Sequence, residues 1–144
     1  MSAKFQFKGL EEVKKKLERI NQRARRAKVI EEFSEEVRLK LVETIEKQGF
    51  KHQGLTKDWA AKKRRMGLDP RILIADGEYV GSIFSGQTST GFFVSTPDSM
   101  AKLAGWLEFG TRRMTARPHW RPVMAWAGRR WDLITEKFGK DILK

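Results

Sequence analysis

Arginine and tryptophan side chains gather between residues 110 and 131 of this 144-residue chain. No Asp or Glu occurs between Gly110 and Arg130. The planar fork of arginine pairs with carboxylates and stacks on indole rings, so arginine is favoured both at protein interfaces and on nucleic acid. Tryptophan and arginine are also enriched among the strongest interface contacts. The stretch therefore predicts a docking surface. Its predicted contact residues are Glu108, Phe109, Gly110, Thr111, Arg112, Arg113, Met114, Arg117, Pro118, Trp120, Arg121 and Trp126.

A second basic cluster lies near the middle of the chain. Its residues are Lys57, Trp59, Lys62, Lys63, Arg64, Arg65 and Arg71. Such a cluster can contact phosphates or an acidic protein through charge-assisted hydrogen bonds, and it can equally be the solvated face of a helix. Trp59 either stacks on a base, as aromatics do in single-strand binders, or anchors this segment to the core.

Glu108 is an acid between two apolar residues, directly before the arginine-rich stretch. This setting predicts partial burial, and a buried charge requires a partner. Arg112, Arg113 or an arginine of a neighbouring copy is the expected partner. We predict an ion pair that fixes the loop or joins subunits, and no catalytic role.

The chain shows no pattern typical of catalysis or metal binding. His52 and His119 are its two histidines, and no acid lies at a ligand-like offset from either. Cysteine is absent, which excludes disulfides and thiolate zinc sites. We therefore predict no enzyme activity, metal, cofactor or small-molecule substrate.

Composition indicates one folded domain over residues 1–144, because 40% of the residues are hydrophobic and five are Trp. No apolar run approaches the length that spans a bilayer, and neither membrane insertion nor secretion is expected. The net charge of +12 attracts anionic partners such as nucleic acid, acidic lipid or an acidic protein face.

Periodicity predicts the elements that position these residues. Residues 4–8 alternate as a short strand. Apolar residues at three- and four-residue steps predict a first helix from Leu10 to Ile20 and a second from Val29 to Gly49.

The second half of the chain predicts further helices and a β-hairpin. The expected elements are a basic helix over 57–66, hairpin strands over 80–88 and 91–95, a short helix over 99–109 and an amphipathic helix over 122–142. Pro122 is expected at the first position of the last helix, with Pro118 in the extended approach. The predicted fold class is α+β.

Two motifs resemble those of bacteriophage tail-completion and head–tail joining proteins. The first is a Glu-Phe-Gly-Thr sequence followed by Met-x-Ala-Arg-Pro and a second proline. It falls on Glu108, Phe109, Gly110, Thr111, Met114, Ala116, Arg117, Pro118 and Pro122. The second, Ile72–Ile83, is similar to a segment of Mu-type virion morphogenesis proteins.

The resemblance implies a non-enzymatic virion subunit that completes the tail or joins it to the head as a homo-oligomeric ring. It implies assembly in the host cytoplasm, localisation at the head–tail joint or the tail end, and partners among tail, connector or portal proteins. DNA passing through such a ring would meet a basic subunit. The alternative is a basic nucleic-acid-binding module that uses residues 57–71 and the arginines after Gly110.

Overall fold

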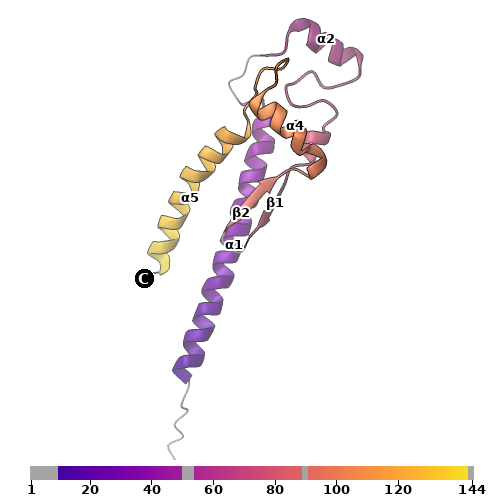
Figure 1. The fold of residues 1–144 in the computed structure, drawn as a ribbon. Helices are drawn as coiled ribbons and strands as arrows, with labels where there is room; N and C mark the ends of the chain where they lie inside the picture. Colours follow the sequence, from indigo (N-terminus) through magenta and orange to yellow (C-terminus); the bar gives the residue numbers. More distant parts are fainter. Residues whose placement is uncertain (1–9, 50–53, 89–90, 143–144) are drawn as a thin grey trace, which may run out of the picture.

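The computed structural model describes residues 10–49, 54–88 and 91–142 (Figure 1). These residues form five helices and one antiparallel pair of strands. The elements in chain order are α1 (Leu10–Glu46), α2 (Lys57–Arg65), α3 (Glu78–Gly81), β1 (Phe84–Gln87), β2 (Phe92–Ser95), α4 (Asp98–Phe109) and α5 (Trp120–Ile142). The expected mixture of helices and strands is confirmed. The strand predicted over residues 4–8, and His52, lie outside the described residues.

Helix α1 is continuous over 37 residues, so the prediction of two helices is wrong. Residues 21–28 contain neither Gly nor Pro, and they are mainly good helix formers. At 1.5 Å per residue, α1 is about 55 Å long. Figure 1 shows that the other elements gather around its C-terminal half, while its N-terminal half extends beyond them.

The core forms where the hairpin, α4 and α5 cover one face of α1. The α1 side chains on this face are Phe33, Val37, Leu41 and Ile45, each at most 2% exposed. Their four-residue spacing keeps them on one side of the helix. Trp131 of α5 packs against Phe33 and Phe92, with ring centroids 5.1 and 6.4 Å away.

The hairpin is confirmed, but its first strand begins later than predicted. Phe84 pairs with Ser95, and Gln87 with Phe92. Residues 78–81 form α3, where a strand from residue 80 was expected. The Asp76 side chain accepts a hydrogen bond from the Glu78 amide at 3.0 Å, an Asx turn directly before this short helix, whose N-cap is Gly77. None of the described helices has the length and apolar composition needed to cross a membrane.

Candidate assembly surface

Residues 111–114, which we term the arginine turn, connect α4 to the approach of α5. Thr111 and Met114 exchange two backbone hydrogen bonds of 2.9 and 3.3 Å, and the Thr111 hydroxyl accepts from the Arg113 amide at 3.2 Å. Arg112 and Arg113 therefore occupy the two central positions, and both side chains are exposed. The Arg117 amide donates to Leu107 O at 2.7 Å and closes the base of the loop.

Gly110 begins this loop because no side chain fits there. Its φ of +77° lies in the left-handed region. A Cβ atom would stand 2.8 Å from both Ala116 N and Met114 O, which are backbone atoms of the returning strand of the loop. The glycine of the first motif is thus a site of close backbone approach.

Glu108 is buried, as predicted, but its partners differ from those predicted. It is 4% exposed. Its carboxylate accepts hydrogen bonds from the amides of His119, Trp120 and Arg121 at 2.8, 3.0 and 3.1 Å, and from Arg121 Nε at 3.0 Å. Arg112 and Arg113, the expected partners within the chain, form no ion pair with it among the described contacts.

This carboxylate caps the N-terminus of α5 from the end of α4. A helix begins with four amides that have no intrahelical acceptor. Glu108 accepts from three of them, and the fourth position is Pro122, which has no amide hydrogen. Pro122 therefore occupies the third helical position and not the first, since α5 begins at Trp120.

The hydrogen bonds decide the charge of Glu108. Burial acts to raise its pKa, but the bonds from the His119, Trp120 and Arg121 amides and from the Arg121 side chain outweigh burial and lower the pKa below its ordinary value. Glu108 is therefore an ionised carboxylate at neutral pH.

This lowered pKa predicts a loss of stability in acid. A carboxyl whose pKa is lower in the folded chain stabilises the fold above its unfolded pKa, and this contribution is lost as the pH falls through the folded value. We expect the free energy of unfolding, measured by urea titration, to decline as the pH falls below about 4.5. Glu108→Gln should be less stable near neutral pH and should flatten this decline. An unchanged pH profile in Glu108→Gln would contradict the assignment.

A buried polar network fixes the first residues of α5. Tyr79 Oη lies 2.6 Å from His119 Nε2, His119 Nδ1 lies 2.8 Å from Arg117 O, and Trp120 Nε1 donates to Tyr79 Oη at 3.0 Å. One arrangement satisfies all three contacts: His119 donates through Nδ1, Tyr79 donates to Nε2, and Trp120 donates to Tyr79. Burial raises the pKa of Tyr79 to about 12, which keeps the phenol protonated. His119 is fully buried.

The predicted contact residues divide between surface and interior. Phe109, Thr111, Arg112, Arg113 and Arg121 are exposed, whereas Gly110, Met114, Arg117, Pro118, Trp120 and Trp126 are half-buried and Glu108 is buried. Trp120 and Trp126 pack against the core. Phe109 is the more accessible aromatic residue, 71% exposed with the Arg121 guanidinium 5.3 Å above its ring. Trp106, which sequence reasoning missed, is 46% exposed.

The residues of the second basic cluster also fall into two groups, those that hold a loop and those that are exposed. Lys63 Nζ donates to Arg71 O and Ile74 O at 2.8 and 2.7 Å, and Arg71 binds Asp69 and Glu46 O. These two cations hold the loop that follows α2. The exposed basic residues of α2 are Lys57, Lys62, Arg64 and Arg65. Trp59 is 48% exposed beneath Lys62 Nζ, which lies 4.9 Å from its ring.

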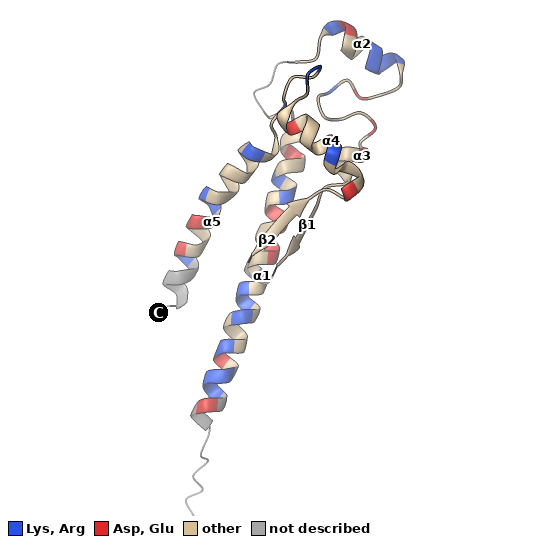
Figure 2. Ribbon diagram, in the orientation of Figure 1, with Lys and Arg blue, Asp and Glu red and all other residues tan. Residues whose placement is uncertain are grey.

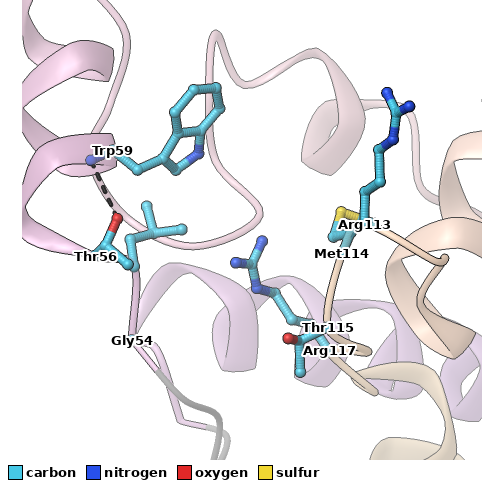
Figure 3. A pocket seen from close by; sticks show the side chains of 8 residues that line it. Gly54, Thr56, Trp59, Arg113, Met114, Thr115 and Arg117 are labelled. Atoms are coloured by element: carbon cyan, nitrogen blue, oxygen red, sulfur yellow. Dashed lines mark hydrogen bonds between the residues drawn. The ribbon is translucent and has the colours of Figure 1, made fainter.

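A pocket of about 440 Å³ joins the two clusters (Figure 3). Trp59 and the Gly54–Thr56 segment form one side, and Met114, Thr115 and two arginines form the other. Figure 3 shows the Arg117 guanidinium pointing toward the segment that bears Thr56. Arg113 and Arg117 line the pocket without any Asp or Glu. The pocket therefore suits a carboxylate with an apolar neighbour.

Charge is distributed unevenly along the molecule. Figure 2 shows Lys and Arg on α2 and on the arginine turn at one end, and further basic residues on the N-terminal half of α1 at the other.

The described residues contain no cluster of three or more potential metal ligands from His, Cys, Asp and Glu. No protein-family model, curated protein or solved structure matches the chain.

Proposed function

We propose that this protein is a non-enzymatic phage virion subunit that completes the tail or joins it to the head. It forms a ring in which the arginine turn and Phe109 of one copy contact an acidic surface of the next copy or of a tail, connector or portal protein. One observation carries this proposal: a braced turn presents Arg112 and Arg113 beside an acid-free pocket.

The positions of the motif residues support the proposal. Glu108 caps α5, Gly110 permits the close approach of the loop, and Thr111 closes the arginine turn. These residues build the loop and leave Arg112 and Arg113 exposed at its tip. A ring uses one heterologous interface repeatedly. A preformed loop suits such a contact because it loses little conformational entropy on binding.

The exposed basic residues of α2 favour a second candidate, a nucleic-acid-binding module. They lie at the same end of the molecule as the arginine turn (Figure 2), so both could contact one phosphate backbone. Such binding weakens steeply as salt rises, because each phosphate contact releases counterions. An interface that combines apolar and ionic contacts depends less on salt.

Charge reversal at the arginine turn tests the proposal. We expect Arg112→Glu/Arg113→Glu to abolish ring formation while the far-ultraviolet circular dichroism stays unchanged, because both side chains are exposed. Light scattering and negative-stain electron microscopy at low and high salt provide the measurement. Arg129→Glu/Lys137→Glu is the matched control, with the same charge change on exposed positions of α5.

Two outcomes would contradict the ring. One is the absence of rings of the natural chain at every concentration and salt. The other is a ring that survives in Arg112→Glu/Arg113→Glu. Tight binding to a DNA duplex only at low salt, by a chain that never forms rings, would favour the second candidate.

A further inference from the structure

The N-terminal half of α1 has exposed apolar side chains on a helical face. Every residue from 14 to 28 is exposed. Leu17 and Ile20 are 56% and 59% exposed, and they share a face with Ala24 and Ala27 at alternating three- and four-residue steps. This spacing is typical of a helix that packs along another helix.

The two halves of α1 carry opposite charge. Residues 14–28 hold eight Lys or Arg and one Glu, whereas residues 31–46 hold six Glu and two Lys or Arg. Figure 2 shows the basic half extending away from the body of the molecule and the acidic residues lying beside the hairpin. The basic half is therefore complementary in charge to the acidic half of another α1.

A groove runs along the acidic half. It has a volume of about 930 Å³, and its wall on α1 includes four glutamates, one lysine, Lys28, and Leu39, while Ser85 of β1 lies opposite. Leu39 is 52% exposed. At 100° per residue, Leu39 and Glu35 project within about 40° of Leu17 around the helix axis. The groove and the apolar stripe thus lie on neighbouring parts of one face of α1.

We propose that this face binds a second copy of the chain, with the two α1 helices antiparallel. The basic half of each helix then lies along the acidic groove of the other, and Leu17 and Ile20 approach the partner copy's Leu39. The contact is self-complementary about a two-fold axis near residues 29–30, as an isologous dimer requires. It uses a surface separate from the arginine turn, so it does not depend on the proposed function.

Other arrangements of this face are less favourable. A parallel α1 pair would place the eight basic residues of one chain beside the same eight of the other, and like charges at helix interfaces disfavour pairing. Nucleic acid would neutralise the charge of the basic half, but it would not cover the groove beside Glu31 and Leu39. Only an antiparallel second copy uses both halves together.

A charge-exchange experiment tests this proposal. It is done in the Arg112→Glu/Arg113→Glu chain, so that contacts of the arginine turn do not contribute. We expect this background chain to sediment at twice the 16.7 kDa monomer mass. Adding Arg25→Glu/Lys28→Glu, or separately Glu31→Lys/Glu32→Lys, should give monomers, because each variant places like charges opposite one another where residues 25–28 of one copy meet residues 31–32 of the other.

Mixing the two variants in equal amounts should restore the dimer, since the reversed positions of one variant then face oppositely charged positions of the other. Both variants stay net positive because the natural chain carries +12, so general attraction does not explain recovery. Recovery also shows that both variants are folded. Glu78→Lys/Asp132→Lys serves as a control that should not disturb the dimer. A monomeric background chain, variants that remain dimeric, or a mixture that remains monomeric would each overturn the proposal.

The orientation is tested separately by single cysteines, because the chain contains none. Lys28→Cys lies close to the proposed two-fold axis and should form a disulfide-linked dimer under mild oxidation. Lys16→Cys should not, since antiparallel pairing holds its two copies far apart. The reverse result would overturn the antiparallel arrangement.

Discussion

Replacement of Glu108 with alanine should lower the free energy of unfolding by about 3–5 kcal/mol, because it leaves the buried and partly buried amides at the start of α5 without their acceptor. Three α5 amides and Arg121 Nε lose their partner at once. Glu108→Gln keeps one side-chain oxygen and should lose less. Urea unfolding followed by circular dichroism measures both effects.

A matched variant separates the cap from the ion pair. Arg121→Ala removes the exposed guanidinium but keeps the three amide bonds, and an exposed charge pair contributes at most about 1 kcal/mol. We therefore expect Arg121→Ala to be far milder than Glu108→Ala. Equal losses in the two variants would show that Glu108 acts mainly through Arg121 and would refute the capping role.

Gly110→Ala should also destabilise the chain, by about 2–5 kcal/mol, from left-handed strain and overpacking together. The added methyl would meet Ala116 N and Met114 O, which are backbone atoms and cannot turn aside as a flexible side chain does. The turn must shift, so the same variant should weaken assembly even where the body of the protein stays folded. Urea unfolding and light scattering measure the two effects.

Gly128→Ala is the control for this change, with the opposite expected sign. Gly128 lies in α5 with no atom within 4 Å of an added Cβ. Alanine is the better helix former by about 1 kcal/mol, so this variant should gain stability. If Gly110→Ala were as stable as the natural chain, this would contradict the close packing of Gly110 against the backbone of Met114 and Ala116.

The sequence predicted the elements with regular periodicity and missed those set by contacts. Helices α2 and α4 end within a residue or so of their predicted limits, because a basic run before Gly67 and an apolar stretch before Gly110 define them. The continuity of α1 was missed because no large apolar residue occurs between Ile20 and Val29, so the two periodic runs were assigned to two helices. Helix α3 has only four residues, too few to show a period.

The exposure of the arginine stretch agrees with the sequence analysis, whereas the contacts that hold the loop were not predicted. The arginine stretch did form an exposed turn, yet the assignment of Trp120 and Trp126 required knowledge of what packs beside α5. The partners of Glu108 come from the next helix, eleven to thirteen residues away. One available signal was overlooked: a helix N-terminus attracts a carboxylate, and Glu108 precedes the only helix start that lacks an acid in its first turn among α2–α5.

For the proposed contact of the arginine turn with a partner, the cap has a kinetic consequence. Glu108, Gly110 and the Leu107–Arg117 hydrogen bond hold both ends of the loop, so its conformational entropy is lost when the chain folds and not when a partner arrives. A partner then orders only the exposed side chains, at about 0.5–1.5 kcal/mol for each long one. Encounters can therefore convert to bound complexes without waiting for loop rearrangement, and differences in affinity among partners should appear mainly in their dissociation rates.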